Sequence, residues 1–318
     1  MPRRLSVRRR ARRSPMPRVV VLGDLMVDVV LAPARPLEVG TDVPGRVSLR
    51  QGGSAATTAR WLARLGVRTT LVCAVARDSE GRALIAAMGS DGVRLRAKRV
   101  AGERTGRIGV LVAPGGERSF VADRAAADRL APADLAAGTF AVDLLHLPAY
   151  SLLGEPLGLA GRRAIELARG AGALVSLDLS SVGPLLADGR HAALRLIRDA
   201  APDVIFATAG EAAALVGGRR SSGLGDLAPL AVIKRGRAGA TVFAVSGDAR
   251  IAFDVATRAL DAADTTGAGD AFDAGFIAAW LATEAGARHR PATLHRSVVA
   301  AHRTAARQLA TVPKELDL

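Results

Sequence analysis

Residues 264–276 read DTTGAGDAFDAGF, a Gly-Ala-Gly turn at 267–269 surrounded by aspartates. Small residues let the backbone turn tightly and leave its N–H groups unobstructed. The apolar residues that follow, Phe272, Phe276 and Trp280, are spaced by four and predict a helix that begins at this turn. The unpaired amides and the dipole of a helix N-terminus favour an anion. A phosphoryl group in transfer is such an anion, because its transition state spreads negative charge that fixed donors can stabilise.

Asp270 falls in the first turn of the expected helix, beside the anion site. A carboxylate there can accept a proton from an attacking hydroxyl group. It can also serve only as a cap or as a partner of the helix dipole. The flanking glycines favour the catalytic role, because capping does not need them. Asp273 lies one turn deeper and is predicted to be structural, whereas Asp264 precedes the turn.

The elements that must position this turn alternate along the chain. Each strand-like apolar run is followed by a helix-like segment, and Gly66 is placed to end the first helix. The expected strands are 19–23, 69–75, 143–147, 174–179 and 203–207, and the expected helices are 54–66, 80–88, 161–172, 189–200 and 211–217. Continuous apolar strands between amphipathic helices predict a mostly parallel sheet covered on both faces, which is an α/β fold.

Two segments interrupt this alternation, residues 29–50 and 106–122. The second reads as a hairpin that turns at Gly115-Gly116. Both segments are expected to form either a small β-rich lid over the sheet edge or ordinary surface hairpins. With no internal repeat and no long linker, residues 16–318 are predicted to form one domain that carries the lid.

The net charge of +14 is unevenly distributed, because residues 1–15 hold seven arginines and no acid. This segment lacks aromatic residues to stack on bases, so nucleic-acid binding is not favoured. We expect a disordered basic tail, and a translation start at Met16 is an alternative. The single cysteine, Cys73, cannot form an internal disulfide and is expected in a buried strand. No apolar run reaches the length of a membrane span, so a cytoplasmic protein is expected.

Several phosphate- and metal-binding motifs are absent from the sequence. It contains no Gly-Lys pair for a Walker A loop, no His-Arg-Asp or Asp-Phe-Gly, and no GxGxxG after the first strand. The five histidines show no spacing typical of a zinc protease. The turn at 267–269 therefore stands as the candidate phosphate site.

The motif at 264–276 resembles the C-terminal signature of the ribokinase-like (PfkB) carbohydrate kinases. A degraded form of the N-terminal signature is found in QGGSAATTARWLARLG at 51–66, and the resemblance runs from residue 18 to about residue 313. It implies a ribokinase-like fold with a small β lid that covers the sugar site and often mediates dimerisation. It also implies transfer of the γ-phosphate of ATP, with Mg²⁺, to a hydroxyl of a sugar or nucleoside.

The resemblance also assigns roles to residues. For phosphoryl transfer it implies a base at Asp270 and an anion hole at Gly267, Ala268 and Gly269. It implies a substrate site at Asp28, Gly52, Gly53 and Thr57, and an ATP site at Thr208, Lys234, Gly236, Gly239 and His302. For metal ions it implies a water-mediated Mg²⁺ contact at Glu211 and, in potassium-activated members, a K⁺ site at Asp264 and Thr266. Lys234 could equally lie in a solvated basic turn, and His302 could be a partly exposed helix histidine.

The chain departs from the family pattern at three asparagines, and it contains no asparagine at all. Thr57 and Thr208 stand at two of these positions, and a hydroxyl can still donate and accept a hydrogen bond. The third departure is the segment Arg124-Ala125-Ala126-Ala127, in which Ala127 cannot replace an amide. A sugar kinase is the leading hypothesis. A nucleoside kinase is disfavoured by an aromatic content of 3%, and a catalytically weak ligand-binding protein is the third alternative.

Overall fold

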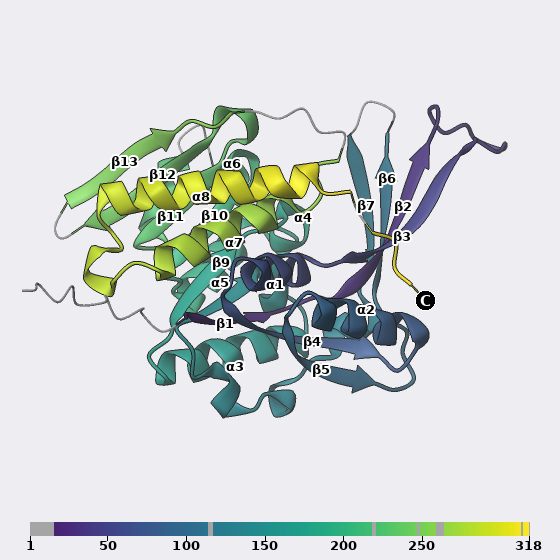
Figure 1. Ribbon diagram of the computed structural model, residues 1–318, viewed down its shortest axis with the longest axis horizontal. Coiled ribbons are helices and arrows are strands. Elements are labelled where there is room, and N and C mark those ends of the chain that lie inside the picture. The colour runs from purple at the N-terminus through teal and green to yellow at the C-terminus, as the bar shows by residue number, and fades with distance from the viewer. Residues whose placement is uncertain are drawn as a thin grey trace, which may run out of the picture.

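The computed structural model describes residues 16–113, 117–217, 221–246, 249–258, 264–312 and 314–317. The predicted basic tail at 1–15 and the predicted turn at Gly115-Gly116 lie outside these residues. Two sheets and their flanking helices make up the fold (Figure 1). The α/β architecture predicted from the alternation of strands and helices is confirmed.

The large sheet has nine strands within the described residues. They are β1 Arg18–Leu22, β4 Arg68–Ala76, β5 Arg94–Val100, β8 Leu144–Pro148, β9 Leu174–Asp178, β10 Val204–Thr208, β11 Leu230–Lys234, β12 Ala240–Ser246 and β13 Ala249–Val255. Their order is β13-β12-β11-β10-β9-β8-β1-β4-β5, and the strands from β5 through β11 pair in parallel. At one edge, β12 pairs in the antiparallel sense with both β11 and β13.

Within the described residues, eight α-helices accompany this sheet, and helices pack on both of its faces. They are α1 Ser54–Arg64, α2 Ser79–Ser90, α3 Leu157–Gly170, α4 Val182–Leu185, α5 Arg190–Ala200, α6 Ala209–Val216, α7 Ala268–Leu281 and α8 Pro291–Ala310. The side chains of β1, which point alternately to the two faces of the sheet, show that both faces are covered. Val19 and Val21 pack with residues of α1, α7 and α8, whereas Val20 and Leu22 pack with residues of α3, α5 and α6. A strand buried on both faces therefore needs the continuous apolar run seen in the sequence.

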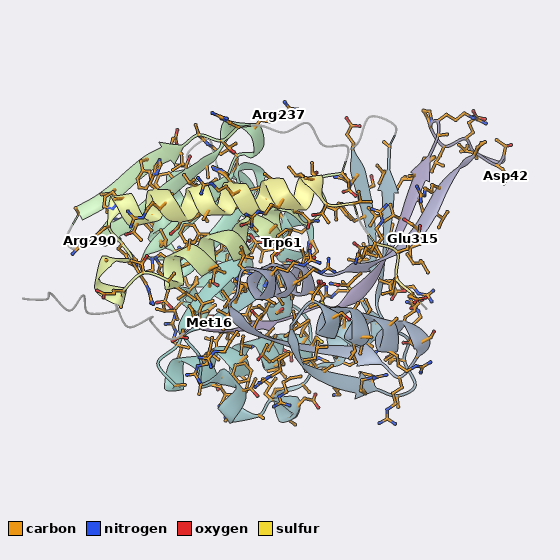
Figure 2. The ribbon with its side chains drawn as sticks, viewed as in Figure 1. Met16, Asp42, Trp61, Arg237, Arg290 and Glu315 are labelled. Carbon is orange, nitrogen blue, oxygen red and sulfur yellow. The ribbon has the colours of Figure 1, made fainter. Side chains whose placement is uncertain are left out.

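A second, four-stranded sheet projects from one end of the molecule (Figure 1). Its strands are β2 Met26–Pro33, β3 Gly45–Gly52, β6 Arg107–Val112 and β7 Arg118–Asp123, in the order β3-β2-β6-β7. They come from the two segments that interrupt the alternation. The C-terminal segment runs beside this small sheet, where Leu316 N donates to Leu49 O at 2.8 Å and Glu315 lies near Arg46 (Figure 2).

Local predictions agree with the structure in detail. Gly66 follows α1 with a φ of +83°, as a residue at the end of a helix requires. Cys73 is buried in β4 and forms no disulfide. Phe272, Phe276 and Trp280 are all buried on α7. No helix in the described residues is both long and apolar enough to span a membrane.

Candidate active site

Three polar residues end neighbouring parallel strands at one edge of the large sheet. Asp178 closes β9, Thr208 closes β10 and Lys234 closes β11, with Thr208 in register with Lys234. The carboxyl ends of parallel strands form the ligand-binding edge of open α/β sheets. Thr208 and Lys234, both predicted to bind ATP, therefore lie at the same sheet edge as Asp178, which sequence analysis did not single out.

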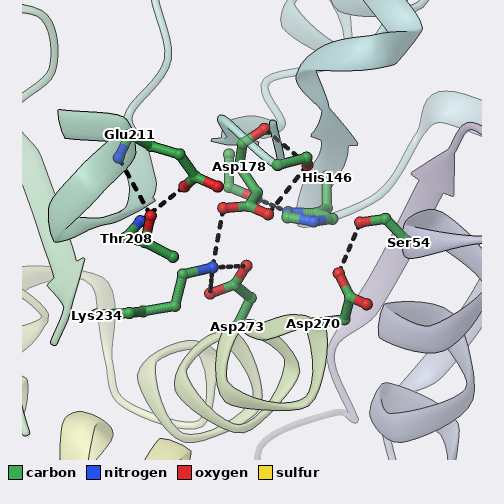
Figure 3. Close-up of polar contacts among 10 residues, drawn as sticks. Ser54, His146, Asp178, Thr208, Glu211, Lys234, Asp270 and Asp273 are labelled. Carbon is green, nitrogen blue, oxygen red and sulfur yellow. Dashed lines mark hydrogen bonds and ion pairs between the residues drawn. The ribbon is translucent and has the colours of Figure 1, made fainter. Parts of the chain in front are cut away.

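Lys234 is held between two carboxylates (Figure 3). Its Nζ lies 2.9 Å from Oδ1 of Asp178 and 3.1 Å from Oδ2 of Asp273. Its side chain is only 11% exposed. The pKa of Lys234 is raised by Asp178 and Asp273, which outweigh the opposing effect of burial. This lysine therefore does not lie in a solvated basic turn, and its charge is balanced before any phosphate binds.

The Gly-Ala-Gly turn begins α7 as predicted. Gly267 is the residue before the helix and has a φ of +72°, which favours glycine. A Cβ there would lie 3.0 Å from Cγ2 of Thr57, so the start of α7 packs closely on α1. The Ala268 amide donates to Thr265 O at 3.2 Å. The donors expected for an anion are therefore the amides of Gly267 and Gly269, and a Cβ at Gly269 would lie 3.4 Å from the Lys234 ammonium.

Asp270 lies in the first turn of α7 and accepts a 2.6 Å hydrogen bond from Ser54 Oγ at the start of α1 (Figure 3). Burial raises the pKa of Asp270 to about 7, the Ser54 hydrogen bond opposes this rise, and the charge of Asp178 adds to it. A carboxylate with a pKa near neutrality is suited to accept a proton at physiological pH. Asp270 therefore has the position and the electrostatics of a general base.

Asp28 on β2 has a buried oxygen, Oδ1, with no hydrogen-bond partner among the described residues. The residue is 9% exposed and borders a pocket of about 460 Å³. Burial, and next the charge of Asp24, raises the pKa of Asp28 to about 7. A buried polar atom without a partner is rare in native proteins, and a ligand can satisfy it. This geometry fits the predicted contact with a substrate hydroxyl.

The diglycine at 52–53 brings the backbone close to two aspartates. A Cβ on Gly52 would lie 1.8 Å from Oδ1 of Asp28, and a Cβ on Gly53 would lie 2.5 Å from the carbonyl oxygen of Asp24. Gly53 also has a φ of +101° as the residue before α1. Thr57 lines the pocket, and its hydroxyl donates to Gly53 O at 3.0 Å. Because its proton is used in this bond, the Thr57 hydroxyl can only accept a hydrogen bond from a substrate, whereas an asparagine side chain could also donate one.

The remaining residues predicted to bind ATP lie around the end of β11 and on α8. Gly236 and Gly239 form the turn between β11 and β12 with φ values of +56° and +88°. Gly239 packs against β13, because a Cβ there would lie 2.1 Å from Val255 O, whereas the space beside Gly236 is open. His302 packs edge-on against Phe272 with ring centroids 5.3 Å apart. Its role against adenine stays a prediction.

Glu211 and Thr208 form a reciprocal cap at the start of α6 (Figure 3). Thr208 N donates to Glu211 Oε2 at 2.7 Å, and Glu211 N donates to Thr208 Oγ1 at 3.2 Å. Burial, and next the charge of Asp178, raises the pKa of Glu211. In the described residues no cluster of three or more acidic, histidine or cysteine side chains could hold a metal alone. The carboxylates of Glu211 and Asp178 are the kind of ligand set that suits a hydrated Mg²⁺ that also binds nucleotide phosphates.

Asp264 is held by the small sheet. Its Oδ1 accepts from Thr266 N at 2.9 Å and pairs with Nη2 of Arg118 at 2.9 Å, and its Oδ2 accepts from Nη1 of Arg50 at 3.0 Å. Both oxygens are therefore engaged, two of the contacts being with positive charges. This arrangement does not fit the monovalent cation expected at Asp264 and Thr266.

Sequence reasoning missed Ser54, Asp24 and Asp178, and it named Arg124 only as part of the segment 124–127 that departs from the family pattern. Asp24 accepts from the Ala55 amide at 3.1 Å and pairs with Nη1 of Arg124 at 3.3 Å. Asp24 and Asp178 carried a signal, because each comes at the end of an apolar strand run. Ser54 carried none, since its partner Asp270 is 216 positions away, and Arg124 pairs both with the distant Asp24 and with Asp128 four residues on.

A mostly parallel sheet with its polar strand ends beside a helix N-terminus, an acid in that helix and a small β lid defines an α/β phosphotransferase of the ribokinase-like class. Residues 16–311 match the family described as pfkB family carbohydrate kinase. The chain belongs to this family, and the prediction of a carbohydrate kinase, which transfers a phosphoryl group to a sugar hydroxyl, is confirmed.

Individual relatives agree with this assignment. The chain is 33% identical over 273 residues to ATP-dependent ribose-1-phosphate kinase of Halopiger xanaduensis, which covers 84% of this chain and 86% of that protein. It is 31% identical over 274 residues to fructokinase of Klebsiella pneumoniae, covering 82% and 83%. The fold is similar to a fructokinase double mutant from Vibrio cholerae O395 with bound fructose, ADP and potassium ion, at a TM-score of 0.75 and 23% identity over 93% of each chain.

Proposed function

We propose that this protein transfers the γ-phosphate of ATP to a hydroxyl of a sugar or sugar derivative, with Asp270 as the base. The observation that carries the proposal is the position of Asp270 at the N-terminus of α7, with a pKa raised by burial to about 7. A carboxylate suited to accept a proton beside helix amides suited to bind a phosphoryl group supports this proposal. The family assignment supports the same reaction.

In the proposed mechanism each group acts by position and charge. Asp270 accepts the proton of the attacking hydroxyl, and Ser54 orients the Asp270 carboxylate by its hydrogen bond. The amides of Gly267 and Gly269 stabilise charge on the transferred group. Magnesium held through water near Glu211 would neutralise charge on the phosphate oxygens of ATP. Thr208, Gly236, Gly239 and His302 are proposed to border the nucleotide.

Lys234 is proposed to act on the nucleotide site indirectly. Its ammonium contacts Asp178 and Asp273 and lies close to Gly269, so it offsets two carboxylates that would otherwise repel a phosphate. Direct contact with ATP would require Lys234 to exchange one of these partners.

The pocket beside Asp28 favours a sugar over a nucleoside as acceptor. Among the described residues that line it, none is aromatic, so it offers no ring on which a base could stack. Asp28, Gln51 and Thr57 line it with polar groups suited to hydroxyls. Arg50, Arg60 and Arg64 also line it, so sugar phosphates belong in the range of acceptors, as the name of the Halopiger relative suggests.

We also propose a cytoplasmic homodimer that forms through the small sheet and its loops. Large apolar side chains are exposed there, namely Leu31, Leu37, Val39, Val47, Phe120 and Val121. Exposed apolar patches of this kind mark interaction surfaces. Light scattering of the purified protein tests this, and a Val47→Lys, Val121→Lys double variant should be monomeric if the small sheet forms the interface.

A coupled ADP-release screen tests the proposed reaction. Fructose, ribose, 2-keto-3-deoxygluconate and ribose 1-phosphate should be compared with adenosine, cytidine and pseudouridine, with Asp270→Asn as the control protein. The proposal expects ADP formation that depends on one sugar or sugar phosphate and on Mg²⁺. Preference for a nucleoside would favour the nucleoside kinase alternative, and no turnover with any acceptor would favour a ligand-binding protein.

A further inference from the structure

The carboxylate of Asp264 joins the small sheet to the loop that leads into the anion site. Arg118 bonds twice to this loop, with Nη2 2.9 Å from Oδ1 of Asp264 and Nη1 2.7 Å from Thr265 Oγ1. Arg50 donates to Oδ2 of Asp264 at 3.0 Å. Two guanidinium groups therefore make three contacts with the loop, at the second and third residues before Gly267.

The two arginines come from opposite edges of the small sheet. Arg50 lies on β3 and Arg118 on β7, the first and last strands in the order β3-β2-β6-β7. Arg50 pairs in register with Asp28, and Arg118 pairs with Val112. Asp28, Val112 and Arg50 all line the pocket, so both arginines extend from the pocket face of the sheet. Both edges of the lid thus converge on one carboxylate across the acceptor pocket.

The two arginines are more sheltered from solvent than the carboxylate that they share. The Arg118 side chain is 9% exposed and the Arg50 side chain 25% exposed, whereas the Asp264 side chain is 37% exposed. Hydrogen bonds between charged groups are stronger than neutral ones, and burial reduces their screening by salt. A monovalent cation at Asp264 would have to compete with two fixed positive charges about 3 Å from the same carboxylate.

We propose that Arg50 and Arg118 form a two-arginine latch on Asp264, which closes the lid over the acceptor and supplies the positive charge that holds the loop before the anion site. The latch rests on the proposed kinase function and adds a regulatory feature to it. Lid closure and the ordering of residues 264–267 become one event, and the enzyme needs no added potassium. The arginines are positioning residues, because they act through Asp264 and not on the phosphoryl group.

Kinetics with and without potassium chloride, at constant ionic strength in tetramethylammonium buffer, test the latch on the full-length protein. The wild-type enzyme should show the same kcat and the same unfolding midpoint in both buffers. Arg118→Met and Arg50→Met should each lower kcat by about tenfold or more, the effect of losing a charged hydrogen bond. Potassium should restore part of this loss, and Arg118→Lys should retain more activity than Arg118→Met.

Arg46→Met is the matched control, because Arg46 lies on β3, in line with Arg50, and its side chain is 81% exposed. It should leave kcat and acceptor KM unchanged. A wild-type enzyme activated by potassium would overturn the proposal, as would Arg118→Met with wild-type kinetics or a defect that potassium does not relieve. If Arg118→Met folds poorly, the response of the wild-type enzyme to potassium and the activity of Arg118→Lys still test the latch. Absence of any turnover in the wild type would instead count against the proposed kinase function.

Discussion

Ser54 Oγ donates a 2.6 Å hydrogen bond to Oδ1 of Asp270, joining the first turns of α1 and α7 across 216 positions of the chain. The two helices come from the two signature motifs, so this one bond links the substrate motif to the phosphoryl-transfer motif. It also stabilises the charged form of a carboxylate that burial would otherwise keep protonated. The pKa of Asp270, which burial raises, is therefore lowered in part by a residue outside its own motif.

Asp270→Asn should lower kcat by at least about 10²-fold, because an amide cannot accept the hydroxyl proton. The unfolding midpoint should stay unchanged or rise, since the substitution removes a buried charge. ADP release and thermal unfolding measure the two effects. Asp199→Asn, a surface change on α5, is the control and should alter neither. Wild-type turnover in Asp270→Asn would remove Asp270 from the mechanism.

The pH profile of kcat/KM should have an acid limb near pH 7. The active form of Asp270 is the carboxylate and its pKa is raised to about 7, so activity should fall as the pH drops through that value. Asp28, whose pKa is also raised to about 7, could produce the same limb. The profile alone therefore does not assign the titrating group.

Ser54→Ala separates the two aspartates. Loss of the hydroxyl removes a contact that lowers the pKa of Asp270, so that pKa should rise and the acid limb should move to higher pH. Ser90→Ala, which removes a hydroxyl that donates to Ala86 O at 3.0 Å, should not move it. A limb that stays in place in Ser54→Ala would assign the titration to another group.

Lys234→Met should destabilise the fold by about 3–5 kcal/mol, because it leaves the buried carboxylates of Asp178 and Asp273 without a counter-charge. Urea unfolding measures this loss. Lys98→Met, which removes a more exposed ion pair with Asp134, should cost about 1 kcal/mol or less. Adding Asp273→Asn to Lys234→Met should restore part of the stability, whereas purely additive losses would mean that the pair is not coupled.

Gly52→Ala should raise the acceptor KM by about tenfold or more, which corresponds to about 1.4 kcal/mol. Its Cβ would lie 1.8 Å from Oδ1 of Asp28, so the carboxylate must leave its position. Gly109→Ala on β6 is the control, because its Cβ would meet Val121 at 3.7 Å, an ordinary contact. Initial rates over a range of acceptor concentrations compare the two, and equal KM values would exclude Asp28 from substrate binding.

Much of the fold and part of the site could be predicted because their causes are local. The period of the apolar residues identified the helices around 54–66 and 271–281, and the Gly-Ala-Gly turn identified the start of α7. Thr208 and Glu211 form a capping box in the structure, a local feature that the sequence analysis did not predict. What these residues contact beyond their own helix was not visible in such patterns.

The sequence by itself determined the α/β class, the two strand segments outside the main alternation and the place of Asp270 at a helix start, since apolar periodicity and glycine act over a few residues. Only the tertiary structure decided which charged side chains form ion pairs with one another. Lys234 reaches Asp178 across 56 positions, and Arg50 reaches Asp264 across 214. Buried charges must find partners wherever the fold brings them together, and no local spacing records that choice.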